Sequence, residues 1–277
     1  MVKSNARKQP GSEAMSATLC IITEVANNVG KITLNRPDVL NSFNRAMAIE
    51  VRDALQQFGE SSEVRAILIT GSGRGFCAGQ DLADFAKTDP SSAHLGTLVR
   101  EQFTPIVRLL RSIEKPVVCA LNGVAAGAGA NIALSCDFII AAEAASLTQA
   151  FSKIGLVPDS GGTYLLPRLV GLSRATQLMM LGEKLSATEA LNLGLVYKVV
   201  PGTELNDESD KFARRLAAMP TRALGLTKRA LNRSLDNDLE AQLKLESELQ
   251  EEAGATEDFA EGVQSFIQKR QAIFKGK

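Results

Sequence analysis

The amino-acid sequence predicts an α/β fold in which a core of strands and helices precedes a helical C-terminal region. Up to about residue 200, apolar runs of strand length alternate with glycine-rich loops and helical patterns. Beyond Pro201 the chain changes to charged amphipathic helices, expected at residues 207–219, 221–234, 238–252 and 258–269. We therefore predict a core at 16–200 and a helical region at 201–277, preceded by a polar, disordered tail at 1–15.

The core is predicted to begin with a β-hairpin and a helix. Residues 19–25 and 30–35 are rich in β-branched side chains, and the Asn-Asn pair at 27–28 tolerates the left-handed dihedral angles of a tight hairpin turn. The apolar residues that follow recur at helical spacing. Asn41 or Ser42 is the expected N-cap, because either side chain can accept a hydrogen bond from an amide of the first turn.

Two further units of the core each consist of a buried strand, a glycine-rich loop and a helix. This order indicates parallel strands, whose carboxyl ends share one edge of a sheet. The expected segments are strand 64–70, loop 71–79, helix 98–113, strand 116–121, loop 122–129, a short helix ending at Cys136, and strand 137–142. A ligand site is therefore expected between the two loops.

The composition argues against several function classes. The 277 residues include 31 basic and 31 acidic side chains, so no net charge attracts the chain to nucleic acid or to an anionic membrane. No apolar run approaches the roughly 20 residues that a membrane span needs. The four cysteines form no CxxC pair and have no histidine nearby. We therefore expect reduced, packed thiols, no metal site and a cytoplasmic location.

The two loops have the composition of backbone binding sites. Residues 73–82 (GRGFCAGQDL) and 122–130 (NGVAAGAGA) combine small side chains with the end of a buried strand, so that free N–H groups can approach a ligand oxyanion. Neither loop has the GxxxxGK[ST] pattern of a phosphate loop or the context of a dinucleotide fingerprint. A simpler interpretation of the first loop is a tight turn in which Asp81 caps the next helix.

Four segments in this order resemble the enoyl-CoA hydratase/isomerase (crotonase) superfamily. They are LNRP at 34–37, FCAGQDL at 76–82, NGVAAGAG at 122–129 and IGLVP at 154–158, and the resemblance extends over residues 19–277. It implies a crotonase-like spiral of ββα repeats with a C-terminal trimerisation region, and hence a homotrimer or homohexamer. It also implies an acyl-CoA substrate, with coenzyme A as part of the substrate and no separate cofactor. By motif position, the amides of Gln80 and Ala128 would hold the thioester oxygen.

The resemblance also identifies a candidate catalytic acid/base. Hydratases of the family carry two glutamates that activate water, whereas the matching positions here are Asn131 and Phe151, neither of which can act as a base. Asp159 stands where several isomerases of the family keep a carboxylate. The stretch at 150–163 is similar to the branch that isomerises ring-1,2-epoxyphenylacetyl-CoA and to Δ3,Δ2-enoyl-CoA isomerases. A structural alternative is that Asp159 caps the helix that opens at Gly161.

The acyl-CoA site is expected to include further residues of these motifs. Loops such as 85–96 are expected to form the walls that select the acyl group. The other residues assigned to substrate binding are Ala78, Gly79, Asp81, Leu82, Gly127, Asn131, Phe151 and Lys277. Three alternatives remain open at this point: a hydratase-type lyase, an RNA-binding relative of the superfamily, and an acyl-CoA binder without catalysis.

Overall fold

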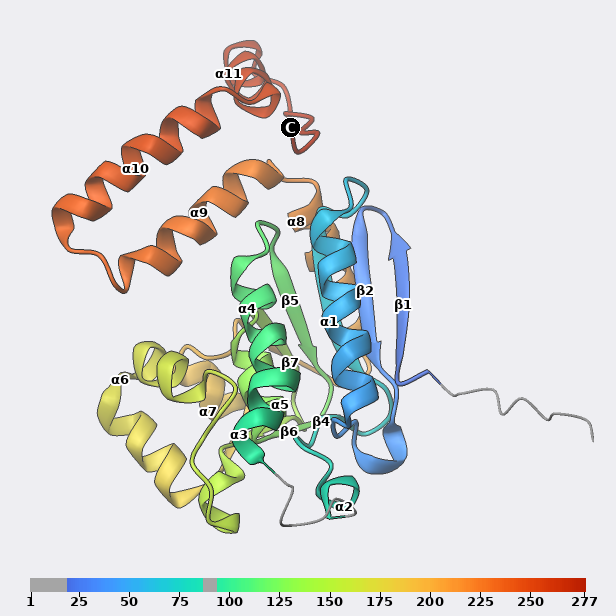
Figure 1. The fold of residues 1–277 in the computed structure, drawn as a ribbon. Coiled ribbons are helices and arrows are strands. Elements are labelled where there is room, and N and C mark those ends of the chain that lie inside the picture. Colours follow the sequence, from blue (N-terminus) through green and yellow to red (C-terminus); the bar gives the residue numbers. More distant parts are fainter. Residues whose placement is uncertain (1–18, 87–93) are drawn as a thin grey trace, which may run out of the picture.

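Two β-sheets form the centre of the computed structural model, which describes residues 19–86 and 94–277 (Figure 1). Within these residues the large sheet has six strands in the order β1-β2-β3-β5-β7-β10, and the small sheet has four in the order β4-β6-β8-β9. Neighbouring strands are parallel except in the β1–β2 and β8–β9 pairs. The strands are β1 (Ile21–Ala26), β2 (Val29–Leu34), β3 (Ala66–Gly71), β4 (Gly75–Cys77), β5 (Val117–Leu121), β6 (Val124–Ala126), β7 (Phe138–Ala142), β8 (Ser146–Thr148), β9 (Lys184–Ser186) and β10 (Lys198–Val200).

The chain alternates between the two sheets in a repeating order. Each of the large-sheet strands β3, β5 and β7 is followed after a short turn by a small-sheet strand, β4, β6 or β8, and then by helical segments. Because the strands within each sheet then pair in parallel, the chain winds as a spiral of strand, strand and helix. This confirms the predicted crotonase-like ββα spiral and the two buried parallel strands within it.

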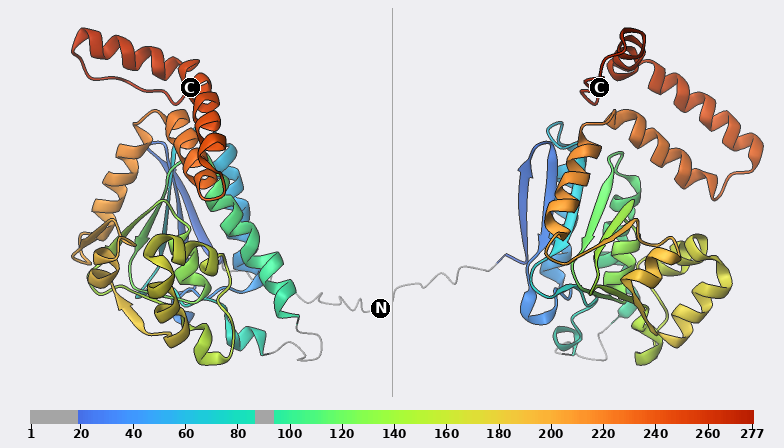
Figure 2. Two further views of the ribbon diagram at one scale, coloured as in Figure 1. Left: turned by 90° about the vertical axis from the view of Figure 1, so that its left-hand side faces the viewer. Right: turned by 180° about the vertical axis from the view of Figure 1, so that it is seen from behind.

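Helices cover both faces of the large sheet. In Figures 1 and 2, α1 and α4 lie on one face, and α8 packs on the other against β3, β5 and β7. No helix in the described part of the chain is long and apolar enough to cross a membrane. The helical segments up to α8 are η1 (Pro37–Val39), α1 (Arg45–Glu60), α2 (Leu82–Phe85), α3 (Leu95–Leu98), the π-helical η2 (Val99–Phe103), α4 (Thr104–Ser112), α5 (Ala128–Leu134), η3 (Ala150–Ile154), α6 (Gly162–Leu181), α7 (Ala187–Asn192) and α8 (Leu205–Ala217).

The last three helices extend away from the sheets, as both views in Figure 2 show. They are α9 (Thr221–Ser234), α10 (Leu239–Gly254) and α11 (Glu257–Gln268), and they agree with the predicted helical composition. A buried ion pair of 2.8 Å between Lys228 on α9 and Asp137 beside β7 joins this extension to the core. Arg65 adds hydrogen bonds to the carbonyl oxygens of Met219 and Phe274. The tail predicted at 1–15 lies outside the described residues.

The hairpin prediction is confirmed, whereas the predicted cap of the first helix is wrong. Asn27 and Asn28 have φ values of 51° and 61°, as the tight turn between β1 and β2 requires. The N-cap of α1 is Asn44, whose side chain accepts a hydrogen bond from the Met47 amide at 2.9 Å. Asn41 cannot cap the helix because its side chain is fully buried and donates to the carbonyl oxygens of Ser72 and Gly75.

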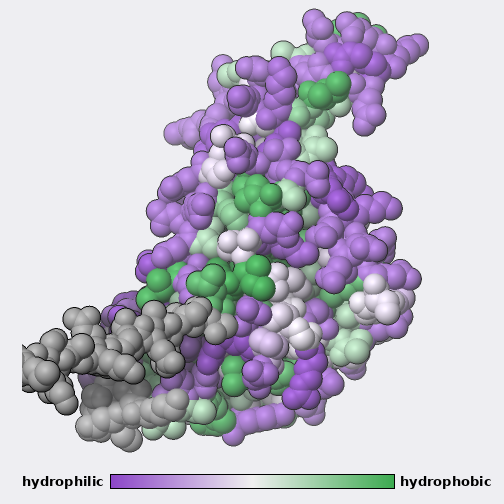
Figure 3. All heavy atoms as spheres, turned by 90° about the vertical axis from the view of Figure 1, so that its right-hand side faces the viewer, coloured by the Kyte–Doolittle hydropathy of each residue, from purple (hydrophilic) through white to green (hydrophobic). Residues whose placement is uncertain are grey.

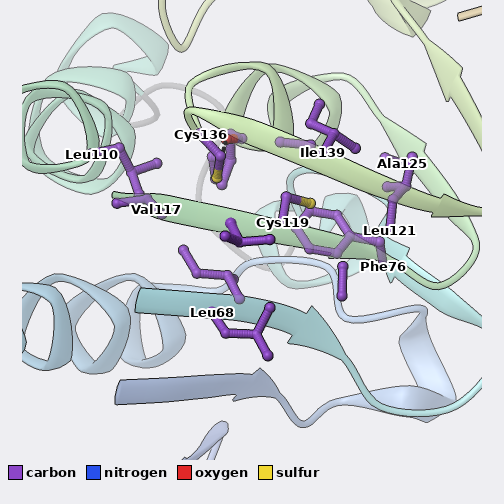
Figure 4. Packing of buried hydrophobic residues seen from close by; sticks show 14 of the residues in the cluster. Leu68, Phe76, Leu110, Val117, Cys119, Leu121, Ala125, Cys136 and Ile139 are labelled. Carbon is purple, nitrogen blue, oxygen red and sulfur yellow. Dashed lines mark hydrogen bonds between the residues drawn. The ribbon is translucent and has the colours of Figure 1, made fainter. Parts of the chain in front are cut away.

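Apolar side chains from both sheets and from the helices pack into one core. Figure 4 shows Leu68, Cys119 and Ile139 of the large sheet close to Phe76 and Ala125 of the small one. Three of the four cysteines are buried, and all four are free thiols, as predicted. Burial raises the pKa of the Cys77 thiol to about 12, although the Gly79 amide acts in the opposite direction.

Helix α5 approaches strand β4 so closely that one position must be glycine. A Cβ atom placed on Gly129 would lie 2.3 Å from the carbonyl oxygen of Cys77 and 2.7 Å from its sulfur. Such contacts are shorter than any that packed atoms tolerate, so a side chain there would push the helix away from the strand. The two glycine-rich segments therefore keep their separation only while position 129 carries no side chain.

We expect Gly129→Ala to lower the free energy of unfolding by about 1–3 kcal/mol, the usual cost of overpacking. Urea unfolding at fixed temperature measures this difference. Gly254→Ala at the end of α10 is the matched control, because a Cβ there meets nothing within 4 Å. The control should be neutral or gain up to about 1 kcal/mol of helix propensity. Equal stability of the two variants would contradict this account of the contact.

Candidate active site

The two glycine-rich loops meet beyond the ends of β4 and β6. Gly79 has a φ of 92°, and a Cβ placed on it would lie 2.9 Å from the Ala126 carbonyl oxygen and 3.5 Å from the Ala128 nitrogen. Only glycine combines this left-handed φ with such an approach of two backbones. The contact places the first loop beside the N-terminus of α5, as the sequence predicted.

Two backbone amides, those of Gln80 and Ala128, border one pocket and have no acceptor among the described residues. The isolated β-bridge between Gln80 and Phe43 is formed by backbone groups of the residues on either side of Gln80, not by the Gln80 amide. Phe43 N donates to Gly79 O at 2.7 Å, and Asp81 N donates to Phe43 O at 2.9 Å. Ala128 is the first residue of α5, where an amide has no partner in a preceding turn. Both amides are therefore available to a ligand oxygen.

The pocket has a volume of about 740 Å³, which falls within the usual range for small-molecule sites. Its walls are mainly apolar. Phe85, Leu95 and Gly96 come from the predicted 85–96 segment, of which residues 87–93 lie outside the described structure. The sequence reasoning did not assign Leu98, Val99, Phe103, Ile154, Leu156 and Val157 to the pocket. The four-residue spacing of positions 95, 99 and 103 marks one helical face and could have revealed part of this wall.

Asp159 is the only carboxylate among the described residues that line the pocket. Burial raises the pKa of its carboxyl group, and the hydrogen bond that Ser160 Oγ donates to Oδ1 at 2.7 Å partly opposes this shift. The Asp159 side chain does not cap α6: the N-cap is Gly161, without a side-chain hydrogen bond. The helix-cap alternative is therefore wrong, and the carboxylate is left facing an apolar pocket.

Phe151 contributes an apolar surface to the pocket beside Gly127. Its side chain is buried, and a Cβ placed on Gly127 would lie 3.6 Å from its ring. Lys153 is the only cation among the described lining residues. The structure brings eight of the predicted site residues into this pocket: Ala78, Gly79, Gln80, Leu82, Gly127, Ala128, Phe151 and Asp159.

Asp81 does not line the pocket, although it was predicted to bind substrate. It is the N-cap of α2, where it accepts the Asp84 amide at 3.0 Å, and it forms a 3.0 Å ion pair with Arg36. Burial acts to raise the pKa of Asp81, but the Asp84 amide and the Arg36 guanidinium together lower it. The cap interpretation is thus confirmed, because these partners occupy the carboxylate.

Asn131 and Lys277 are also placed away from the pocket lining. Asn131 is fully buried, and its amide nitrogen donates to the carbonyl oxygen of Asp159 at 2.8 Å. Lys277 lies at the far end of the molecule in Figure 1, where its carbonyl oxygen accepts the Asp258 amide. The chain therefore does not carry its own C-terminal lysine to this site. Within residues 19–86 and 94–277 there is also no cluster of His, Cys, Asp and Glu suited to a metal ion.

A family model described as enoyl-CoA hydratase/isomerase matches residues 24–277. The chain belongs to the enoyl-CoA hydratase/isomerase family. Its relatives in this family include the 1,2-epoxyphenylacetyl-CoA isomerase of Escherichia coli (strain K12), which is 47% identical over 93% of this chain and 98% of that protein. The crotonyl-CoA hydratase of Syntrophomonas wolfei is 36% identical over 93% of this chain and 98% of its own length.

Solved structures of the enoyl-CoA hydratase/isomerase family have the same fold. The enoyl-CoA hydratase of Bacillus anthracis superposes with a TM-score of 0.86 at 35% identity, covering 93% of this chain and all of that one. The enoyl-CoA hydratase of Mycobacterium smegmatis superposes with a TM-score of 0.86 at 28% identity, covering 92% of this chain and 98% of that one. The similarity between the sequence motifs and this family is thereby confirmed for the whole folded chain.

We expect Asp159→Asn to stabilise the protein at neutral pH. Because burial raises the pKa of Asp159 above its unfolded value, the charged form disfavours folding, and stability is lost as pH rises through the folded pKa. The gain in the variant should shrink toward zero below about pH 4, where both states are protonated. Urea unfolding across this range measures it, with the exposed Asp53→Asn on α1 as control. A pH-independent difference for Asp159→Asn would contradict the argument.

Proposed function

We propose that this protein is an acyl-CoA isomerase that removes a proton from the carbon beside the thioester carbonyl. The proposed substrate is 2-(1,2-epoxy-1,2-dihydrophenyl)acetyl-CoA or a Δ3-enoyl-CoA. The observation that carries the proposal is the joint position of Asp159 and two free amides on one apolar pocket. In this proposal coenzyme A is part of the substrate, and no separate cofactor takes part.

In the proposed mechanism, the amides of Gln80 and Ala128 hold the thioester oxygen while the Asp159 carboxylate takes the C2 proton. Each such donor contributes on the order of 2.7–4 kcal/mol when charge develops on the oxygen. The raised pKa of Asp159 makes it a stronger base than an exposed aspartate and brings the pKa closer to the working pH. The apolar walls support this role, because they keep water from the carboxylate and the enolate.

The remaining electron flow defines the product. For an epoxide substrate, the electron pair from C2 becomes a double bond to the ring, and the bond between the two epoxide carbons breaks. A ring carbon then takes a proton, so that the oxepin product has the composition of the substrate. For a Δ3-enoyl substrate, the proton returns at C4 and the double bond moves to C2. Neither route adds water.

The structure disfavours a hydratase as the alternative function. By the family resemblance, Asn131 and Phe151 stand where hydratases carry glutamates; Asn131 is fully buried, and Phe151 presents an apolar ring. Water activation by two carboxylates therefore has no counterpart among the described lining residues. The E. coli relative at 47% identity bears the name of an epoxyphenylacetyl-CoA isomerase, which supports the choice of substrate.

Asp159→Asn tests the proposed chemistry. We expect wild-type protein to isomerise the epoxide or a Δ3-enoyl-CoA, followed by mass spectrometry and ultraviolet absorbance, and to hydrate crotonyl-CoA very slowly or not at all. The variant should lose nearly all isomerisation while keeping its affinity for a CoA product, because the amides and pocket walls remain. Asp53→Asn is the surface control.

Two results would overturn this proposal. The first is efficient hydration of crotonyl-CoA by the wild-type protein. The second is an Asp159→Asn variant with more than about a tenth of wild-type turnover, a barrier change below about 1.4 kcal/mol.

We also propose a homotrimer or homohexamer built through the C-terminal helices. Large apolar side chains on α10 and α11 are exposed, among them Leu239, Phe266 and Ile267 at 70%, 86% and 72%. Figure 3 shows such hydrophobic groups interrupting the largely hydrophilic surface, both on the core and on this extension. In the proposed assembly, a neighbouring subunit covers these side chains.

Sedimentation velocity at micromolar concentration is expected to give three or six times the 29.6 kDa chain mass. Phe266→Glu should shift the protein toward smaller species, because the change places a charge in the interface. Ile22→Glu on the outer strand β1 is the control and should leave the sedimentation unchanged. A wild-type protein that sediments only as a monomer would contradict the assembly.

A further inference from the structure

Asn131 does not line the pocket itself, but it links three segments that lie around the pocket. It lies on α5, one turn after Ala128, and its Nδ2 donates to the Asp159 carbonyl oxygen at 2.8 Å. Its Oδ1 accepts Gln149 Nε2 at 2.7 Å, just before the η3 segment that contains Phe151. The Asn131 side chain is fully buried, so losing either hydrogen bond would leave one of its polar atoms unpaired and away from water.

The turn that carries Asp159 depends on support from outside. Ser160 and Gly161, the next two residues, have φ values of 51° and 75°, a conformation that costs a non-glycine residue roughly 1–2 kcal/mol. The helix that follows has no side-chain cap. In the described part of the chain, the bond from Asn131 is the only one that a side chain of another element donates to this turn.

The fit around the Asn131 amide leaves little freedom. A Cβ placed on Gly162 would lie 2.3 Å from Asn131 Nδ2, so the amide occupies the space that a side chain at 162 would need. Gln149 offers its Nε2 group to the other end of the amide and thereby fixes which end faces the turn. Position and orientation of the Asn131 side chain are both determined by these neighbours.

We infer that Asn131 is a positioning residue that sets the distance between the Ala128 amide and the Asp159 carboxylate, with Gln149 holding its orientation. One helix carries both the oxyanion donor and the side chain that anchors the base, so the two move together. This inference rests on the proposed function, in which Asp159 is the base. An error of about 1 Å in such a separation can cost on the order of a hundredfold in rate.

The experiment follows deuterium incorporation at C2 of phenylacetyl-CoA in D₂O by mass spectrometry. We expect Asn131→Ala to lower kcat for exchange by about tenfold to a hundredfold, with KM changed by less than about twofold, because the pocket walls are intact. The control is Ser135→Ala on the same helix. It removes one buried hydrogen bond, from Ser135 Oγ to the Asn131 carbonyl oxygen, but leaves the bond to Asp159.

A pH profile and a second variant separate positioning from a general loss of stability. Loosening the turn lets water reach Asp159, so the midpoint of the rise in kcat with pH should fall in Asn131→Ala. Gln149→Ala should also lower kcat and the pH midpoint, but by less than Asn131→Ala does. The double variant should resemble Asn131→Ala, because Gln149 acts only through Asn131.

Several results would overturn the inference. One is an Asn131→Ala kcat above about a third of wild type with an unmoved midpoint, and another is an equal loss in Ser135→Ala. If Asn131→Ala does not fold, Gln149→Ala is the test variant. A Gln149→Ala protein whose kcat and pH midpoint equal those of the wild type would then contradict the positioning role. Asp159→Asn is measured in the same assay. If Asp159→Asn still exchanges deuterium, the proposed function fails as well. If Asp159→Asn is inactive while Asn131→Ala exchanges at the wild-type rate, only the positioning role is overturned.

Discussion

The close approach of two backbone segments is the constraint on which the site depends. Gly79 lies against Ala126, and Gly129 lies against Cys77, at separations that exclude a Cβ atom. The groups that this contact brings to the pocket are main-chain amides, so the two backbones themselves must lie close together. The ββα spiral supplies it by ending β4 and β6 next to each other in the small sheet. The proposed oxyanion site is thus a consequence of how the strands pair.

Helix α5 turns this contact into a site with defined chemistry. Its first amide is free, its second residue packs on β4, and Asn131 one turn later holds the turn that carries Asp159. The half-buried carboxylate of Asp159 beside an apolar wall reduces stability at neutral pH, and the same burial would strengthen it as a base. In the proposed mechanism, the region around Asp159 therefore gives up folding free energy for reactivity, which is common at active sites.

An ion pair and hydrogen bonds hold the extended C-terminal helices to the core. Lys228 is almost fully buried against Asp137, and burial lowers its pKa while the aspartate acts to raise it. Arg65 adds bonds to the carbonyl oxygens of Met219 and Phe274. This arrangement fixes the direction of the helices and leaves their apolar side chains on the surface.

The sequence by itself determined the parallel strands and the two glycine-rich loops, because glycine spacing and strand-length apolar runs are local signals. The spiral fold, the amides of Gln80 and Ala128, and Asp159 followed from the resemblance of its motifs to the crotonase superfamily. Only the tertiary structure decided that Asp81 pairs with Arg36 and that Asn131 donates a hydrogen bond to the carbonyl oxygen of Asp159. It also decided that Leu98, Val99 and Phe103 line the pocket. For the same reason the N-cap of α1 is Asn44 and not the predicted Asn41 or Ser42. Which way a side chain points depends on partners that are distant along the chain, and no local pattern records them.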